Sequence, residues 1–497
     1  MDAIDFYKEL YPDSFTGKKM IEPLVGYTLN EVRIRPVHSR ISPHEVDLSC
    51  KIGPVELNFA LLSAAMDTVS GSELGKALSE IGACCIIYRD KRSETQLKMA
   101  KDVLDHKPFL IAEPKCVYLD DPLEYVKDIL EEYDYSTIPV INRKGILKGV
   151  LFTRDIVFKD KTQEKASKWM VPLDELKVES VSTSLNIIQD RLLNEQECSV
   201  LPIVDEDKKL KGIYFMIDFF QANLSTFNDK SLVGVAVGVQ EEDLDRVREA
   251  IKMGVGVIVI DSSHGNCSPV IEQAKKIVKI VDGRAAVIAG NITDIDGYLR
   301  LAQEARVDGV KAGIGSGSIC TTSQSTGAGF PMFTLIRELA HTRNYLLSQG
   351  KHAPLIIPDG GISGPGEMVV AIAAGGHICM AGEWLVAAKE SISSQQSNVF
   401  SGYVYYRGMA SKKAIEKRLS ERYGRQKKAP EGIEGLVPLR GPLKKWIGED
   451  IELIQGGFSH VGAGNIKEIH KICKNPMVFV RFTSAGQKQI ETRVETL

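Results

Sequence analysis

Short, almost entirely apolar segments recur through the second half of the chain. They are VGVAVG (233–238), VGVIVID (255–261), AAVIAGN (285–291), GVKAGIG (309–315), PLIIPDG (354–360) and HICMAG (377–382). Apolar runs without polar alternation are typical of parallel strands that are covered on both faces. We therefore expect a series of buried parallel strands between Leu232 and Gly382.

Helical patterns separate these strands. In EEDLDRVREAIKMG, Leu244, Val247 and Ile251 recur at helical spacing. Ser268 and Pro269 are expected to be the N-cap and first turn of a helix over VIEQAKKIVKIV. Alternating strands and helices predict βαβ units. A (β/α)8 barrel, an α/β fold, is favoured over an open sheet because polar residues or glycines end strand after strand, and in a barrel these ends meet at one mouth. They are Asp261, Asn291, Gly315, Asp359 and Gly382.

Residues 113–225 interrupt this rhythm with an internal repeat. STIPVINRKGILKGVLFTRDIV (136–157) is echoed by CSVLPIVDEDKKLKGIYFMIDFF (198–220). Each copy has an apolar strand, a polar turn, a second strand and an acidic helix start, which indicates an inserted tandem domain. The chain is thus expected to divide into 1–112, 113–225 and 226–497, with 1–112 and 226–497 forming the barrel.

Composition narrows the class of protein. The formal net charge is −3 and 43% of residues are hydrophobic, which favours a soluble globular protein over one that binds nucleic acid or membrane. No apolar run approaches the roughly 20 residues of a membrane span. The nine cysteines are scattered without a CxxC pair, and the start MDAIDFYKELYPDSF is unlike a secretory signal. A cytoplasmic location is expected.

The segment GIGSGSICTTSQSTGAGF (313–330) is the strongest candidate for chemistry. It follows a predicted strand, and Gly315 and Gly317 let the backbone approach a ligand closely. Ser318 adds a hydroxyl donor. Cys320, followed by Thr321 and Thr322, would be exposed to that ligand as a nucleophile. From spacing alone, a structural glycine-rich turn with a bystander cysteine is an equally good interpretation.

GSGSICTT resembles the signature loop of the inosine monophosphate dehydrogenase and guanosine monophosphate reductase family. Further stretches resemble the same family in the same order, over roughly residues 25–485. They are GYTLNEVRIRPVHS (26–39), LLSAAMDTVS (61–70), DSSHGN (261–266), AGN (289–291), PDGGI (358–362), YRGMAS (406–411) and PEGIEG (430–435).

This resemblance implies covalent catalysis. Cys320 would attack C2 of the purine, hydride would leave to NAD, and the resulting thioimidate would be hydrolysed. Thr322 and Glu431 would handle protons near the sulfur. In a mobile flap at 400–435, Arg422 and Tyr423 match the pair that dehydrogenases use during hydrolysis.

The resemblance also assigns binding residues. Asp359 would hold the ribose hydroxyls; Ser318, Gly361 and Tyr406 match phosphate contacts, and Met409 and Glu431 match contacts to the base. Gly360, Gly382 and Ala410 would join this purine nucleotide site. The NAD side would include Asp261, Ser262, Ser263, Asn291 and Gly313. Backbone carbonyls of Gly315, Gly317 and Cys320 match those that hold a monovalent cation, usually potassium.

The repeat at 113–225 resembles the family's inserted pair of CBS modules. Thr153 and Asp155 match its ribose-contacting pattern, whereas the second copy keeps Asp218 but has Met216 in place of the threonine. Regulatory adenine or guanine nucleotides are one interpretation and a purely structural insertion is another. The resemblance also implies a homotetramer or an octamer.

One departure bears on the substrate. Glu383 stands where the family usually has a serine near the phosphate, and a carboxylate there would repel a dianion unless it is neutralised. Three hypotheses follow: NAD-dependent oxidation of inosine monophosphate, NADPH-dependent reduction of guanosine monophosphate, and a diverged nucleotide-binding paralogue. The Arg422–Tyr423 pair favours the first.

Overall fold

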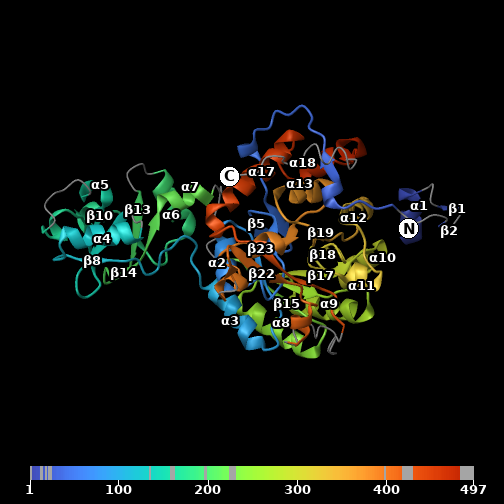
Figure 1. The fold of residues 1–497 in the computed structure, drawn as a ribbon, viewed down its shortest axis with the longest axis horizontal. Helices are drawn as coiled ribbons and strands as arrows, with labels where there is room; N and C mark the ends of the chain where they lie inside the picture. The colour runs from blue at the N-terminus through green and yellow to red at the C-terminus, as the bar shows by residue number, and fades with distance from the viewer. Residues whose placement is uncertain are drawn as a thin grey trace. The chain divides into compact units, whose positions relative to one another are not determined.

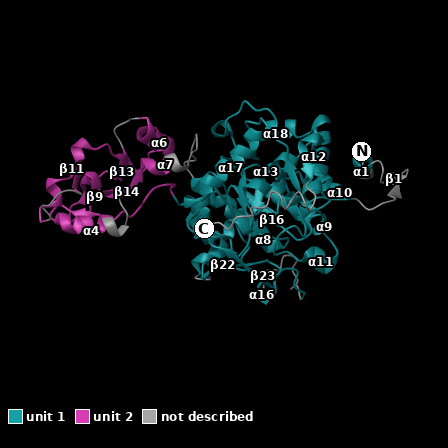
Figure 2. Ribbon diagram, turned by 45° about the horizontal axis from the view of Figure 1, so that its top comes forward, with its two compact units in different colours: residues 1–106, 231–497 teal, residues 107–230 magenta. Residues whose placement is uncertain are grey.

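The computed structural model describes residues 3–481 apart from 12–14, 17–18, 21–24, 134–135, 157–162, 195–198, 223–230, 397–398 and 417–428 (Figure 1). The chain forms two compact units (Figure 2). The first combines residues 1–106 with 231–497, and the second spans 107–230. The insertion predicted at 113–225 lies within the second unit.

Parallel strands form a closed barrel in the first unit. Each strand contacts the next along the chain, and the last strand pairs with the first. Two of these contacts, between the first and second strands and between the seventh and eighth, are made by the single backbone bridges Leu62–Cys84 and Asp359–Met380. The predicted (β/α)8 barrel is therefore confirmed. Its strands are β6 (Leu61–Ser63), β7 (Cys85–Ile87), β15 (Val233–Val237), β16 (Val257–Asp261), β17 (Ala286–Ile292), β18 (Gly309–Ala312), β19 (Leu355–Pro358) and β20 (Cys379–Ala381).

Helices follow the strands and cover the barrel. Leu244, Val247 and Ile251 are buried on α8, as their spacing predicts. The N-cap prediction at Ser268 is wrong by one residue, because Cys267 holds the extended backbone before the helix and Ser268 is already helical. No described helix is long and apolar enough to span a bilayer. The covering helices are α2 (Ser72–Glu80), α3 (Ser93–Leu104), α8 (Glu241–Met253), α9 (Ser268–Val281), α10 (Ile295–Arg300), α12 (Met332–Ser348), α13 (Pro365–Ala374) and α17 (Ile447–His460).

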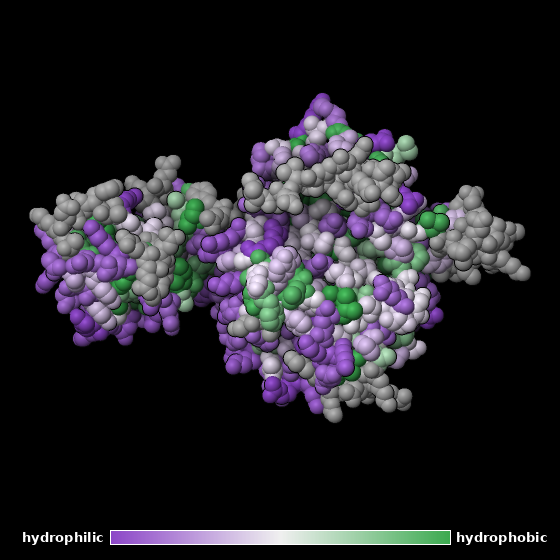
Figure 3. Space-filling view, in the orientation of Figure 1, coloured by the Kyte–Doolittle hydropathy of each residue, from purple (hydrophilic) through white to green (hydrophobic). Residues whose placement is uncertain are grey.

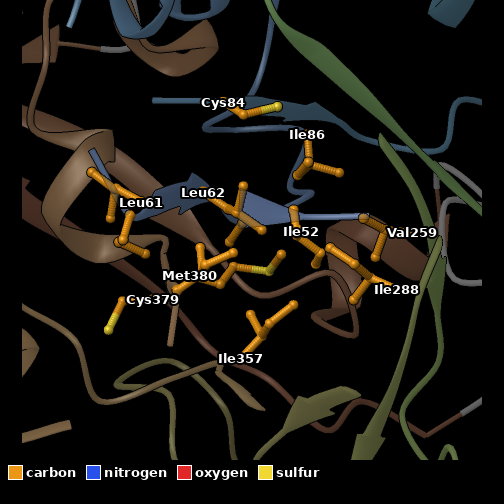
Figure 4. Close-up of a cluster of buried hydrophobic side chains, with 14 of the residues drawn as sticks. Ile52, Leu61, Leu62, Cys84, Ile86, Val259, Ile288, Ile357, Cys379 and Met380 are labelled. Carbon is orange, nitrogen blue, oxygen red and sulfur yellow. The ribbon is translucent and has the colours of Figure 1, made fainter. Parts of the chain in front are cut away.

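The barrel interior is apolar (Figure 4). Leu62, Ile86, Val259 and Ile357 converge there from four strands, and all four are fully buried. Ile52 reaches the same cluster from the hairpin of β4 (Cys50–Ile52) and β5 (Val55–Leu57). Polar chemistry is therefore left to the carboxyl ends of the strands.

The remaining elements of the first unit are short. Two antiparallel pairs lie near its termini, β1 (Phe15–Thr16) with β2 (Lys19–Met20) and β3 (Val32–Ile34) with β24 (Phe479–Arg481). Short helices are α11 (Thr322–Thr326), α14 (Glu383–Val386), α15 (Ile392–Gln395), α16 (Lys412–Glu416) and α18 (Ile466–Ile472).

A small antiparallel sheet follows the barrel strands. It joins β21 (Val399–Phe400), β22 (Tyr403–Arg407) and β23 (Glu434–Pro438). Val404 and Tyr406 are buried on its inner face, whereas Phe400 and Leu436 are exposed and contribute to the green patch over β22 and β23 (Figure 3). The sheet thus presents the Tyr406 ring inward.

The two sheets of the second unit share one pairing pattern, a parallel pair followed by an antiparallel pair, and the first sheet has one further strand. Its sheets are ordered β11-β10-β9-β8 and β12-β13-β14. Thr153 and Asp155 lie in the first turn of α5, and Asp218 lies in that of α7. The elements are β8 (Val117–Tyr118), α4 (Leu123–Tyr133), β9 (Thr137–Ile141), β10 (Leu147–Phe152), α5 (Thr153–Ile156) and β11 (Val171–Pro172), then β12 (Glu179–Ser180), α6 (Leu185–Leu193), β13 (Val200–Val204), β14 (Leu210–Phe215) and α7 (Met216–Ala222).

The amino-terminal helix α1 (Ala3–Leu10) packs against α10 and α12. Phe6 is fully buried, with its ring edge-on to Tyr345 at 5.1 Å. Beyond the helix, the Tyr11 hydroxyl donates to Glu338 Oε1 at 2.5 Å, while Glu338 Oε2 is buried without a partner among the described residues. Burial raises the pKa of Glu338 from 4.5 to about 7, although the Tyr11 hydrogen bond opposes the shift.

We predict that this contact weakens as the pH rises. A carboxyl group whose pKa is raised by docking stabilises the docked state most below pH 4.5, and that stabilisation is lost between pH 4.5 and 7. The measurement is the rate of chymotrypsin cleavage within residues 3–11 in the wild type and in Glu338→Gln. Taking the ratio of the two rates at each pH cancels the pH dependence of the protease itself. The ratio of wild-type to variant rate should rise roughly tenfold or more between pH 5.5 and 8.

Glu249→Gln removes an exposed carboxylate from α8 and is the matched control. Its cleavage rate should follow that of the wild type at both pH values. A ratio for Glu338→Gln that stays constant with pH would show that Glu338 does not govern the docking of α1.

Candidate active site

One cavity lies where the strands of the barrel end. Residues from the loops after β16, β17, β18, β19 and β20 meet there with residues that flank β22 and β23. All the predicted site residues that the structure describes line it. These are Asp261, Ser262, Ser263, Asn291, Gly313, Gly315, Gly317, Ser318, Cys320, Thr322, Asp359, Gly360, Gly361, Gly382, Tyr406, Met409, Ala410 and Glu431. Arg422 and Tyr423 lie outside the described residues.

The loop that carries Cys320 is fixed by backbone hydrogen bonds. The Cys320 amide donates to the Gly317 carbonyl at 3.0 Å, which closes a tight turn. The Thr321 amide donates to the Glu431 carbonyl at 3.1 Å, and Cys320 forms a backbone bridge with Gly432. The segment before β23 therefore holds the cysteine loop in place.

A chain of side-chain hydrogen bonds runs from the thiol to a carboxylate. Cys320 Sγ donates to Thr322 Oγ1 at 3.3 Å, and Thr322 Oγ1 donates to Glu431 Oε2 at 3.2 Å. All three side chains are partly buried at the cavity. This arrangement gives the thiol proton a path to a carboxylate through one hydroxyl, as nucleophilic catalysis by cysteine requires.

Lys311 on β18 is a functional residue that the sequence reasoning missed. It is 3% exposed, and its ammonium lies 2.7 Å from Asp261 Oδ1 and 2.8 Å from Asp359 Oδ2. Burial alone would lower the pKa of Lys311, but the two carboxylates raise it. A single lysine inside the apolar strand GVKAG was the available signal, since an unpaired ammonium is costly to bury.

Asn291 ties this network to the cysteine loop. Its Nδ2 donates to Asp359 Oδ2 at 2.8 Å and to the Gly313 carbonyl at 2.6 Å. Asp359 Oδ2 therefore accepts from two donors, Asn291 Nδ2 and Lys311 Nζ. A carboxylate held in this way can accept hydrogen bonds from a vicinal diol.

Backbone groups form another side of the cavity. Gly360 and Gly361 both have positive φ, at 106° and 72°. A Cβ on Gly360 would lie 2.9 Å from the Gly317 amide nitrogen, so only glycine allows these two loops to approach. Successive amides in such conformations can form an anion-binding nest.

Tyr406 and Glu383 line the cavity as well. Burial raises the pKa of Tyr406 far above its usual value, and the nearby Glu383, Asp359 and Cys320 raise it further. Tyr406 is therefore a neutral hydroxyl donor at physiological pH. Glu383 is the first residue of α14 and lines the same cavity.

The cysteine turn fits a monovalent cation better than a transition metal. Among the described residues, no group of histidine, cysteine, aspartate or glutamate side chains could hold a metal ion. The Gly317–Cys320 hydrogen bond instead closes a turn that holds the peptide units of Gly317 and Cys320 close together, two residues after Gly315. Carbonyl oxygens are hard ligands of the kind that alkali cations take.

Comparisons with known proteins point to one family. The profile of the IMP dehydrogenase / GMP reductase domain matches residues 26–493. An inosine-5′-monophosphate dehydrogenase from Aquifex aeolicus (strain VF5) is 35% identical over 476 residues, covering 93% of this chain and 94% of that protein. A protein of the same name from Bacillus subtilis (strain 168) is 31% identical over 477 residues, with the same coverage.

Solved structures of GMP reductases are similar to this chain as well. A GMP reductase from Trypanosoma brucei in complex with guanosine 5′-monophosphate superposes with a TM-score of 0.65 at 26% identity. The superposition covers 96% of this chain and 99% of that one. Another structure of a GMP reductase from the same organism has a TM-score of 0.68 at 25% identity.

Proposed function

Because this chain belongs to the IMP dehydrogenase / GMP reductase family, we propose that it is an NAD-dependent dehydrogenase that oxidises inosine 5′-monophosphate to xanthosine 5′-monophosphate. The observation that carries the proposal is the Cys320–Thr322–Glu431 chain of hydrogen bonds at the cavity. The identity to bacterial inosine-5′-monophosphate dehydrogenases favours this reaction over reduction.

Cys320 forms the covalent bond to the substrate. Its sulfur attacks C2 of the purine, a C–S bond forms while the C2=N3 double bond opens with its electron pair onto N3, and the thiol proton passes through Thr322 to Glu431. The C2–H bond then breaks, its electron pair leaves with the hydrogen as hydride, and the electron pair on N3 restores the C2=N3 double bond. NAD, when bound, accepts that hydride. The purine remains attached to Cys320 as a thioimidate.

Water completes the reaction. Its oxygen adds to C2, its proton is taken by a base, and the C–S bond breaks to release the product and restore the thiol. Glu431, through Thr322, is one acceptor for the water proton, and Arg422 is the second. An arginine in this role needs an environment that favours its neutral form, because guanidinium ordinarily stays protonated.

Other residues orient the reactants. Asp359, held by Lys311 and Asn291, accepts the ribose hydroxyls. Ser318, Gly361 and Tyr406 take the phosphate, and Met409, Ala410 and Glu431 contact the base. Asp261, Ser262, Ser263, Asn291 and Gly313 would hold NAD. The carbonyls of Gly315, Gly317 and Cys320 would hold potassium, which would keep the cysteine turn in shape.

Two parallel assays test this function. Purified protein with potassium receives inosine monophosphate plus NAD in one cuvette and guanosine monophosphate plus NADPH in another. We expect NADH to appear in the first and NADPH to persist in the second. Consumption of NADPH without NADH formation would establish reduction of guanosine monophosphate, the second candidate, which the likeness to the Trypanosoma brucei GMP reductases favours.

We predict that Arg422→Ala slows hydrolysis far more than hydride transfer. Loss of one base should cost roughly 10²-fold or more in the steady rate, while the first turnover still forms NADH. Stopped-flow absorbance should therefore show a burst of NADH followed by a slow phase. Arg425→Ala, which removes a neighbouring arginine, is the matched control and should keep the wild-type rate. An unchanged steady rate in Arg422→Ala would show that Arg422 is not a base in the hydrolysis step.

The second unit is assigned a regulatory role in the same proposal. Thr153, Asp155 and Asp218 stand at the first turns of two equivalent helices, α5 and α7. Hydroxyl and carboxylate groups at these positions suit the ribose of an adenine or guanine nucleotide. A homotetramer or octamer in the cytoplasm is the assembly expected for the family.

A further inference from the structure

Glu383 lines the cavity, and its carboxylate has no counter-charge among the residues that the structure describes. Among the residues that the structure describes, no hydrogen bond or ion pair reaches it. The cavity lining has four carboxylates, from Asp261, Asp359, Glu383 and Glu431, and one cation, Lys311. Lys311 is already shared between Asp261 and Asp359. A negatively charged ligand therefore meets an uncompensated negative charge at Glu383.

Among the described residues around Glu383, no cation is free, and the nearby Tyr406 hydroxyl donates to Met66 Sδ at 3.6 Å. Tyr406 on β22 is buried and neutral, and its raised pKa reflects burial first and Glu383 next. The adjacent Arg407 is committed to Asp67, and Arg440 is committed to Asp450, which also accepts the Trp384 indole. Helix α15, which packs against α14, carries no titratable side chain. The other charged or titratable groups around the cavity are Asp261, Lys311, Cys320, Asp359 and Glu431.

A phosphate monoester reduces its repulsion from the Glu383 carboxylate if it binds with one proton still attached. Its second pKa is near 6, so at pH 7.5 the monoanion is about thirtyfold scarcer than the dianion. Placing a second negative charge about 4 Å from a carboxylate at an effective dielectric constant near 20 lowers affinity by far more than a hundredfold. Uptake of a proton is therefore the less costly route, and the resulting P–OH becomes a donor to the carboxylate.

We propose that Glu383 makes nucleotide binding proton-coupled. The 5′-phosphate binds as the monoanion, and its P–OH donates a hydrogen bond to the Glu383 carboxylate. This inference rests on the proposed function, which places the phosphate at Ser318, Gly361 and Tyr406. Glu383 is thus a specificity-determining residue that selects the protonation state of the ligand.

Calorimetric titration of the full-length protein with inosine monophosphate, without NAD, tests the proposal. At pH 7.5, titrations in buffers of different ionisation enthalpy give the number of protons taken up per nucleotide bound. The wild type should take up about one. Glu383→Ser and Glu383→Gln should take up close to none, and their affinity advantage over the wild type should grow about tenfold per pH unit between pH 7 and 8.5.

Glu249→Gln, which removes a carboxylate on α8 outside the cavity, should behave as the wild type does. Thermal unfolding checks that both Glu383 variants are folded. Tight binding to the wild type without proton uptake would overturn this inference and leave the proposed function intact. Absence of binding to the wild type and to both variants at every pH would overturn the proposed function, and this inference with it.

Discussion

Cys320→Ala should abolish turnover while the protein still binds inosine monophosphate. The sulfur is the only protein group in the proposed mechanism that bonds to the purine, and removal of a catalytic nucleophile costs roughly 10⁴-fold or more in rate. The side chain is small and partly exposed at the cavity, so its truncation should leave the fold unchanged. The rate of NADH formation at saturating substrates and the calorimetric Kd are the two readouts.

Cys267 provides a matched control for this variant. It is also partly buried, and it follows β16 at the same end of the barrel, but it does not line the cavity. Cys267→Ala should keep its activity within about twofold of the wild type, because its thiol only donates to the His264 carbonyl. Substantial NADH formation by Cys320→Ala would rule out covalent catalysis at this position.

Lys311→Met should have the second largest effect, on both stability and substrate affinity. Without the ammonium, the buried Asp261 and the partly buried Asp359 are left as a pair of like charges. Breaking a buried ion pair from one side costs about 3–5 kcal/mol. Because Asp359 would lose its orientation as well, we expect KM for inosine monophosphate to rise more than kcat falls. Urea unfolding followed by tryptophan fluorescence, together with steady-state kinetics, measures both effects.

The pH dependence of this loss has a definite sign. The raised pKa of Lys311 keeps it charged in the folded protein throughout neutral pH, so the wild type retains its contribution until the solution becomes strongly alkaline. In Lys311→Met, protonation of one carboxylate would relieve the repulsion between two like charges, so the variant should recover stability as the solution becomes more acidic. Lys351→Met, at an exposed position, should match the wild type. Equal stability of Lys311→Met and the wild type at pH 8 would contradict the role given to this lysine.

The barrel could be predicted because its signals are local. Apolar runs such as 257–260 identify buried strands, and the polar residue that ends each run identifies the mouth. Asp261, Asn291 and Asp359 were found in this way, and their meeting in one cavity follows from closure of the sheet. The sequence predicts Ser268 as an N-cap, one residue after the actual cap, Cys267, because serine is a common N-cap and cysteine is not.

The pairings between distant residues could not be predicted. Thr322 and Glu431 are 109 positions apart, and only the fold shows that their side chains are hydrogen-bonded. In the sequence, Lys311 is an unexpected charge in an apolar strand. Only the structure shows the two carboxylates, from other strands, that lie beside it. Likewise, Glu383 was recognised as unusual from the sequence, whereas only the structure shows that Arg407 and Arg440, in the described part of the chain, are paired with other carboxylates.

Trapping the covalent intermediate tests the central claim most directly. The wild type is mixed with isotopically labelled inosine monophosphate and NAD, quenched in acid during turnover, and digested with trypsin. We predict a nucleotide adduct on Cys320 in the peptide spanning residues 312–337, which lies between the cleavage sites after Lys311 and Arg337. The adduct should be missing when NAD is omitted and in Cys320→Ala. Formation of NADH with no adduct on this peptide, or with the adduct on another residue, would contradict the account.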